Sequence, residues 1–298
     1  MSGVHHVGHV VRDMTAGLAL YRRLGFTVPP PVYPALPREG GAPEPFGAAN
    51  THAELTRGFM ELATVATGDV PPDARLLPLV SPGPDLLGPI EATTRRLAGL
   101  LDEGEGLHIL VFASSDVDAT AARLDAAGVS HDGVATVHAG AQTVRYLDAH
   151  VPGGRIGVAT GNALGGDVPT HPNGAEEVAD VVLGVPDSEL DTVRDRYERL
   201  LDRTARAEGP ARVLDLDGAR VTLVPASALG SVLPGERPRR RTAIAGVAVT
   251  VADLDATRRL LTDRAVPTHP TPRGGVLVPS HGALGAAIEF RPRSTPDR

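Results

Sequence analysis

The sequence predicts an α+β fold made of four βαβββ units that pair into two barrels. One pattern, an apolar strand that ends in aspartate and is followed by a helical segment, recurs four times in 298 residues. Each helical segment is followed by apolar stretches separated by Gly or Pro, which are typical of two or three strands. A single unit has one apolar sheet face that it cannot bury alone, so we expect the units to pair.

The four aspartates that mark the repeats are Asp13, Asp116, Asp187 and Asp253. Each stands where a strand gives way to a helix, and a carboxylate there can accept hydrogen bonds from the free amides of the first turn. The apolar residues after each aspartate recur at helical spacing. We therefore expect a capped helix in every unit.

The first unit continues with strands over 48–55 and 59–65. The segment 66–106 then separates it from the second unit and contains a predicted helix, LLGPIEATTRRLAGLL, that packs outside the barrel or acts as a lid. An irregular stretch from Gly161 to Ala175 links the two halves. We expect an N-terminal domain over 1–165 and a C-terminal domain, with two degenerate units, over 175–298.

Two absent residue types restrict the chemistry. The chain has no Cys, which excludes disulfides, thiolate nucleophiles and Cys-based metal sites. It also has no Lys, which excludes Schiff-base catalysis and a phosphate-loop lysine. The net charge of −7 and an aromatic content of 3% argue against a nucleic-acid partner.

Nothing in the sequence indicates a membrane partner. No apolar stretch approaches the ~18 residues that span a bilayer, and the N-terminus lacks the features of a signal peptide. We therefore expect a cytoplasmic protein.

Several features of the first unit form one pattern. His6 lies seven residues before Asp13, the helix ends in LGF, a GAAN segment follows, and the strand FMELATV contains Glu61. With these features the unit resembles the glyoxalase-like domain of the vicinal oxygen chelate superfamily, which includes glyoxalase I, extradiol dioxygenases, fosfomycin-resistance enzymes and bleomycin-binding proteins. The segment Thr170 to Ala175 resembles the join before the third unit of such chains. The pattern covers nearly the whole chain, but only the first unit carries specific motifs.

The resemblance implies one mononuclear metal site in a cupped sheet. Its ligands would be His6, Glu61 and His108. Fe²⁺ is the first candidate for the bound ion, and Mn²⁺, Ni²⁺, Zn²⁺ or Co²⁺ are alternatives. The ion would act as a Lewis acid on a substrate with two adjacent oxygens. His108 lies eight residues before Asp116 instead of seven, so its role requires a one-residue bulge; the alternative is a half-buried strand histidine.

Strand alternation separates the N-terminal histidines. His6 shares a face with Gly8 and Val10, whereas His5 and His9 share the other, so His9 should face the helices if His6 faces the cup. Buried carboxylates are costly, so Glu61 should meet a metal, an arginine or solvent.

The other units depart from the ligand pattern. The second offers Gly157 or Val158 at the last-strand position, and the second half offers Asp180, Gly246 and Glu289. We therefore expect the metal in the N-terminal half, unless the first unit pairs with the fourth and brings Glu289 near His6.

Further polar residues near the same barrel are candidates for substrate binding, each with an ordinary surface position as the competing interpretation. They are Asn50, His52, Arg145, Tyr146, His150 and, from the linker, His171.

The leading hypothesis is a metal-dependent enzyme that acts on a small oxygenated organic compound, either as a dioxygenase or as a lyase or isomerase through a metal-bound enolate. The rival is a non-catalytic binding protein that sequesters a drug or natural product in the same cup. A third possibility is a paralogue that retains only the fold. A monomer is feasible, and a homodimer is the alternative.

Overall fold

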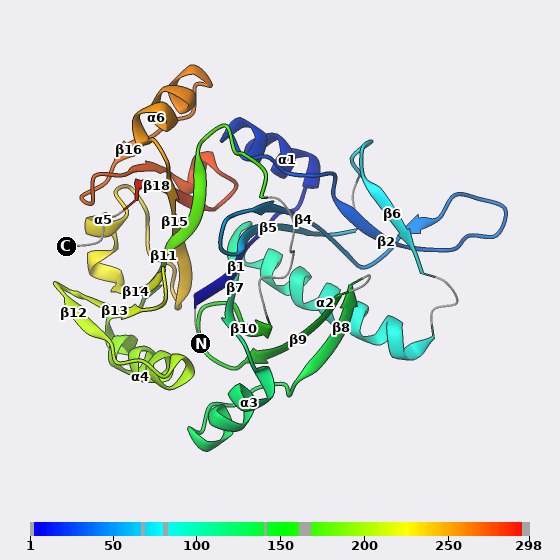
Figure 1. Ribbon diagram of the computed structural model, residues 1–298, viewed down its shortest axis with the longest axis horizontal. Coiled ribbons are helices and arrows are strands. Elements are labelled where there is room, and N and C mark those ends of the chain that lie inside the picture. The colour runs from blue at the N-terminus through cyan, green and yellow to red at the C-terminus, as the bar shows by residue number, and fades with distance from the viewer. Residues whose placement is uncertain (1–2, 67–68, 80–82, 140–141, 161–167, 294–298) are drawn as a thin grey trace.

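The computed structural model describes residues 3–66, 69–79, 83–139, 142–160 and 168–293, and Figure 1 shows their arrangement. The chain forms two mixed β-sheets, one from each half. Part of the predicted link between the halves, 161–167, lies outside the described residues.

The N-terminal sheet has ten strands. Nine lie in the order β3-β2-β4-β5-β1-β7-β10-β9-β8, and β6 pairs with β2. Their bounds are β1 (Gly3–Val10), β2 (Val32–Leu36), β3 (Glu44–Pro45), β4 (Ala48–Glu54), β5 (Phe59–Val65), β6 (Arg75–Pro78), β7 (Gly106–Ser114), β8 (Ala135–Ala139), β9 (Gln142–Ala149) and β10 (Arg155–Thr160).

The C-terminal sheet has eight strands in the order β12-β13-β14-β11-β15-β18-β17-β16. Their bounds are β11 (Ala175–Val185), β12 (Arg206–Glu208), β13 (Ala211–Asp215), β14 (Arg220–Pro225), β15 (Ala243–Val251), β16 (His269–Pro270), β17 (Val276–Val278) and β18 (Ala287–Pro292).

The first strands of neighbouring units form the centre of each sheet. β1 runs antiparallel to β7, and β11 runs antiparallel to β15. The first unit therefore pairs with the second and the third with the fourth, which confirms the predicted pairing of four units. Each strand order ends at an edge strand on both sides, so within the described residues the sheets are open and not closed barrels.

Four helices lie on the inner side, where the two sheets face each other: α1 (Met14–Arg23), α3 (Val117–Ala126), α4 (Leu190–Leu201) and α6 (Leu254–Asp263). Their apolar residues join those of both sheets in one hydrophobic cluster. α1 lies beside α6 and α3 beside α4, at opposite ends of the molecule (Figure 1).

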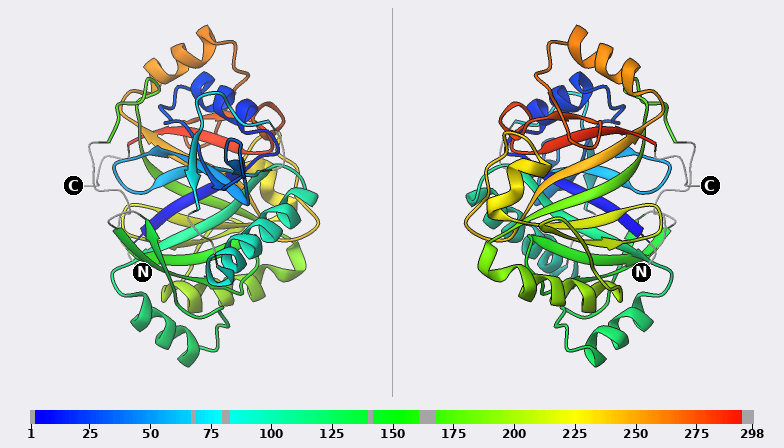
Figure 2. Two further views of the ribbon diagram at one scale, coloured as in Figure 1. Left: turned by 90° about the vertical axis from the view of Figure 1, so that its right-hand side faces the viewer. Right: turned by 90° about the vertical axis from the view of Figure 1, so that its left-hand side faces the viewer.

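Two helices lie on the outer faces instead: α2 (Pro84–Asp102) on the N-terminal sheet and the short α5 (Leu229–Val232) on the C-terminal sheet. Figure 2 shows the sheets from these two outer sides.

Three of the four predicted aspartate caps form. Asp13, Asp116 and Asp253 each accept a hydrogen bond from a backbone amide of the helix that follows. The fourth prediction is wrong, because Asp187 begins a 3₁₀ turn, η1 (Asp187–Glu189), and its carboxylate accepts from the amide of Ser227. α4 starts only after that turn, so no aspartate side chain caps it.

Arginine side chains fasten the paired helices across the two halves. Arg23 on α1 donates to the carbonyls of Arg264 and Ala265, and Arg264 donates back to those of Arg22 and Arg23. These bonds satisfy carbonyls at helix ends that have no partner within their own helix. The two halves therefore share both a core and a set of directional contacts.

Candidate functional site

The outer face of the N-terminal sheet is an apolar surface that α2 partly covers. We call it the N-terminal cup. Leu97 and Leu101 of α2 pack on it. Its buried floor consists of Val10, Ala63, Val65, Ile109, Val111 and Ala159.

His6 and Glu61 lie together on this face. Glu61 stands opposite Gly8 in the register of β1 and β5, and its Oε2 is 3.8 Å from His6 Nε2. Gly8 leaves room for the carboxylate, since a Cβ built there would lie 3.0 Å from Glu61 Oε2. The two side chains are 15% and 14% exposed, so water reaches both. His9 faces the other way, as expected, and its ring lies against Tyr21 of α1.

Neighbouring side chains fix the orientation of this pair. Asn50 Nδ2 donates to Glu61 Oε1 at 2.9 Å, which leaves Oε2 toward the histidine. His5 Nδ1 lies 2.8 Å from His6 Nδ1, so the His6 ring is held through its far nitrogen. Burial, followed by the nearby His5, His52 and Arg155, lowers the pKa of His6 well below its usual value. The imidazole is therefore neutral at physiological pH.

An aromatic group borders the pair. Phe59 stacks on His6 with ring centroids 4.6 Å apart and meets the edge of His52 at 4.5 Å. His52 Nδ1 lies 3.6 Å from Glu54 Oε1, and burial raises the pKa of Glu54 to about 7. Thus Asn50 and His52, both predicted to bind substrate, lie at the His6–Glu61 pair.

The structure does not bring His108 into this pair. β7 does carry a bulge at this residue, since Gly8 pairs with Ile109 but His9 pairs with Leu107. The bulged His108, however, places its Nε2 2.8 Å from the carbonyl of Gly104. Ile109 takes the position opposite Gly8 on the cup face.

The second unit therefore supplies no ligand at the positions equivalent to His6 and Glu61. Ile109, seven residues before Asp116, occupies the position equivalent to His6. Gly157 occupies the position equivalent to Glu61. No three His, Asp or Glu side chains of the described residues come together in a metal-holding group. Two donors fall short of the three protein ligands typical of a catalytic metal site. The described side chains thus do not fit a tightly bound metal.

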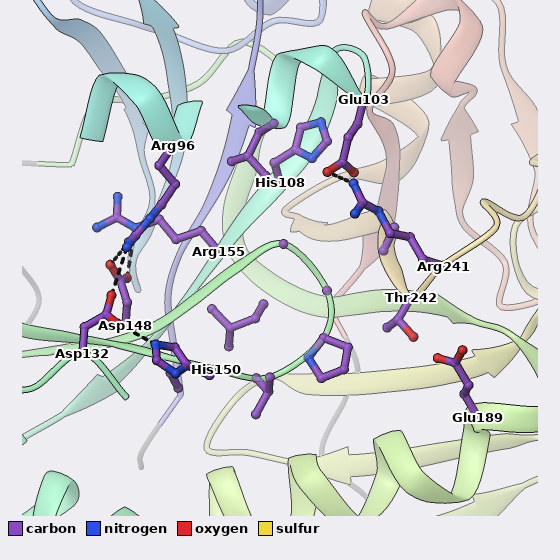
Figure 3. A pocket seen from close by; sticks show the side chains of 18 residues that line it. Arg96, Glu103, His108, Asp132, Asp148, His150, Arg155, Glu189, Arg241 and Thr242 are labelled. Atoms are coloured by element: carbon purple, nitrogen blue, oxygen red, sulfur yellow. Dashed lines mark hydrogen bonds and ion pairs between the residues drawn. The ribbon is translucent and has the colours of Figure 1, made fainter. Parts of the chain in front are cut away.

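A cavity of about 490 Å³ adjoins the cup between α2, β10 and the start of β15 (Figure 3). Arg96 of α2 makes ion pairs with Asp132 and Asp148, and His150 pairs with Asp132. These contacts fasten α2 to the β8–β9 side of the sheet. His150, another predicted substrate residue, and His108 both line this cavity.

Arg155 connects the cavity to the cup. It is paired with Ile109 across β10 and β7, and its Nε donates to Asp148 Oδ1 at 3.0 Å. It also contributes to the lowered pKa of His6. Arg155 and Asp148 were not predicted from the sequence. Arg155 lies two residues before Gly157, so alternation along the strand would have placed its side chain on the same face as Gly157. The ion pair with Asp148 joins two strands, and the spacing of residues does not predict it.

The remaining predicted substrate residues lie elsewhere. Arg145 makes an ion pair with Asp118 near α3, and Tyr146 packs at the margin of the cup cluster. His171 accepts from the amide of Thr27 through Nδ1 and lies 2.6 Å through Nε2 from the carbonyl of Glu54. Both of its ring nitrogens are thus engaged with backbone groups, and its ring meets the edge of Phe26 in the core between the sheets.

The sequence matches one protein family. The family model described as "Glyoxalase-like domain" covers residues 4–201. No functionally curated protein matches the chain.

Solved structures share the fold over nearly the whole chain. A triple mutant of 4-hydroxymandelate synthase from Streptomyces coelicolor aligns with a TM-score of 0.66 at 15% identity, over 99% of this chain and 94% of the other. A hypothetical protein from Staphylococcus aureus aligns at 0.57 and 10% identity, over 97% and 99%. The Mn(II)-bound glyoxalase from Novosphingobium aromaticivorans aligns at 0.55 and 15% identity, over 97% and 81%.

At such identities the likeness concerns the fold, which is that of the vicinal oxygen chelate proteins. The described part of the chain has no helix long and apolar enough to cross a membrane. Because the family model covers residues 4–201, which is well over half of the sequence, the chain belongs to the glyoxalase-like domain family.

Proposed function

We propose that the protein binds a small, oxygen-rich organic molecule at the His6–Glu61 pair of the N-terminal cup, without a resident metal ion. The observation that carries this proposal is the spacing of 3.8 Å between His6 Nε2 and Glu61 Oε2. It is longer than a hydrogen bond, so the two atoms leave room for an atom of a ligand to bond to both.

A ligand hydroxyl suits this spacing. The carboxylate of Glu61 can accept a hydrogen bond from the hydroxyl group. The neutral His6 offers Nε2 as a second polar contact for the same oxygen. Asn50 holds the carboxylate in place, so little side-chain entropy is lost on binding. Phe59 and His52 supply an aromatic border for an apolar part of the same ligand.

A metal-dependent enzyme is the second candidate. It is favoured by the chemistry of the pair itself, a neutral imidazole beside a carboxylate, with the far nitrogen of His6 held by His5. The Mn(II)-bound glyoxalase has the same fold. In this case a divalent ion held by His6 and Glu61 would need further ligands from the substrate or water, and its chemistry would be that of a Lewis acid.

Elemental analysis of untagged protein, combined with calorimetric titration of catechol and its mono-O-methylated analogue guaiacol, tests both candidates. We expect less than about 0.1 equivalent of metal and tighter binding of catechol. Glu61→Gln and His6→Ala should weaken catechol binding at least about tenfold, because each removes a hydrogen-bond partner. His150→Ala, at the cavity outside the pair, is the control and should change affinity less than about twofold.

The alternative outcomes separate the candidates. About one metal ion per chain, lost in both His6→Ala and Glu61→Ala, would refute the metal-free proposal and favour the enzyme. Equal affinities of the wild type and of Glu61→Gln for catechol would exclude the pair as the binding site of this compound.

A further inference from the structure

The C-terminal sheet contains a charged cluster at two positions equivalent to His6 and Glu61 but taken from different units: Asp180 has the His6 position of the third unit and Glu289 the Glu61 position of the fourth. Asp180 lies seven residues before Asp187, as His6 lies seven residues before Asp13. Glu289 pairs with Ala248 across β18 and β15, as Glu61 pairs with Gly8 across β5 and β1.

Both carboxylates are buried on the outer face of their sheet. Asp180 is 0% and Glu289 is 1% exposed. They share a face with Val182 and Ala287, which belong to the apolar cluster under α5. Two buried carboxylates in one apolar environment need a cation, because an unpaired buried charge is strongly unfavourable.

Arg291 is the cation that both carboxylates share. Its Nη1 is 3.2 Å from Asp180 Oδ2, and its Nη2 donates to Glu289 Oε2. Thr222 donates to the other oxygen of Asp180 at 2.8 Å, and Thr271 donates to Glu289. Burial alone would lower the pKa of Arg291, but the two carboxylates raise it, so the guanidinium stays charged.

Two further arginines complete the balance of charge. Arg220 and Arg273 bind Asp180 Oδ2 at 2.9 and 2.8 Å from the more exposed side, and Arg273 also contacts Glu208. Glu208 also pairs with Arg206, which in turn pairs with Asp215, so four guanidinium groups face four carboxylates. The cluster is neutral without any bound ion.

We infer that Arg291 is a built-in cation between the two buried carboxylates Asp180 and Glu289 of the C-terminal sheet, and that shortening it opens an oxygen-lined site for a hard divalent cation. Shortening Arg291 would free Glu289 Oε2 and remove one of the three guanidinium groups at Asp180 Oδ2, while Arg220 and Arg273 stay on Asp180. The ligands would then be the carboxylates of Asp180 and Glu289 with the hydroxyls of Thr222 and Thr271, and oxygen-only sites prefer Mn²⁺, Ca²⁺ or Mg²⁺. In the wild type the guanidinium of Arg291 takes the place of such a cation between Asp180 and Glu289. The inference does not depend on the function proposed for the N-terminal cup.

Mn²⁺ binding to the full-length chain tests the inference. All variants carry Glu61→Gln, so that an ion held by the N-terminal pair is not counted. In that background Arg291→Ala should bind about one Mn²⁺ per chain by electron paramagnetic resonance, whereas the parent should bind none. At ten times the dissociation constant, Mn²⁺ should raise the melting temperature of Arg291→Ala by about 2 °C.

Two matched variants control the result. Arg220→Ala removes a more exposed partner of the same Asp180 and should not create Mn²⁺ binding, because Arg291 remains. Adding Asp180→Asn to Arg291→Ala removes one donor and one charge, and should abolish the Mn²⁺ effect.

Each other outcome has a defined meaning. If Arg291→Ala folds only when it is refolded with Mn²⁺, the inference is supported; if it does not fold with Mn²⁺ either, or folds and binds none, it is overturned. Equal Mn²⁺ binding with and without Asp180→Asn, or binding by the parent that Glu289→Gln removes, would also overturn it.

Discussion

At the scale of single residues, His9 couples the folding of the two halves to pH. Its ring is fully buried between α1 and the C-terminal half, and its Nε2 donates to the carbonyl of Leu284 at 2.9 Å. Burial lowers its pKa to about 4, against 6.5 for the free side chain. The unfolded chain therefore takes up a proton at His9 well before the folded protein does.

The first prediction concerns this pH dependence. The contribution of neutral His9 to the free energy of unfolding is fully present above pH 6.5. It falls by up to about 3 kcal/mol as the pH is lowered toward 4. His9→Gln keeps an amide donor for Leu284 but cannot titrate. Urea unfolding between pH 7 and 4 should thus show a shallower loss of stability in the variant. Parallel curves for the two proteins would refute the role of His9.

The candidate pair was predictable because its signals are local. The motifs through which the first unit resembles the glyoxalase-like domain single out His6 and Glu61 from short stretches of sequence, and the register of β1 with β5 places the two residues on a common face. The orientation of His108 was not predictable, because a bulge has the same sequence signature whichever way its side chain points. The pairing of Arg155 with Asp148 depends on side-chain geometry between strands, which spacing alone does not specify.

At the scale of elements, the aspartates that precede the helices differ in their effect. Asp253 accepts from the amide of Ala256 at 2.9 Å and thereby satisfies one of the free amides of α6. Asp187, at the equivalent place in the third unit, bonds to the amide of Ser227 instead.

The second prediction compares these two residues by circular dichroism during thermal unfolding. Asp253→Ala should destabilise the protein by about 1 kcal/mol, through loss of the cap. Asp187→Ala should not weaken α4 in the same way, since no side chain caps that helix; its cost should be that of one exposed hydrogen bond, about 0.5 kcal/mol. Costs in the reverse order would contradict the assignment of the caps.

Helices and central strands were predictable from periodicity, whereas the position of α2 was left open between packing outside the barrel and acting as a lid. Its sequence predicts a helix, and the structure has one over Pro84–Asp102. Its docking on the outer face depends on Leu97, Leu101 and the ion pairs of Arg96, which connect it to strands far along the chain. Contacts of that range carry no periodic signal.

At the scale of the whole molecule, the two halves meet at a very close backbone approach. Gly285 has a φ of 81°, and a Cβ built there would lie 2.0 Å from the carbonyl oxygen of Glu105. Gly274 has a similar φ of 77° but no heavy atom within 4 Å of such a Cβ. The two glycines differ mainly in whether they face the other half.

The third prediction follows from this difference. Gly274→Ala should cost about 1 kcal/mol, the strain of a left-handed backbone. Gly285→Ala should cost about 3 kcal/mol or more, because the backbones of the two halves must also move apart. Chemical unfolding of both variants measures the difference, and equal costs would show that the halves do not press together here.

The pairing of units was predicted only in part from the sequence. Each unit must pair because it has to bury one apolar sheet face. Pairing of the first unit with the fourth would bury that face as well as pairing of the first with the second. The antiparallel ladders of β1 with β7 and of β11 with β15 decide the matter, and such ladders depend on the register of apolar faces across the whole sheet.

The outward-facing surfaces of the two sheets also bear on how the protein can be handled. α2 and α5 lie on opposite sides of the molecule (Figure 1). A biotin tag on a cysteine introduced near α5 would attach the chain to a sensor surface with its His6 side toward the flowing solution. Because the natural sequence contains no cysteine, such labelling would be specific to that one position.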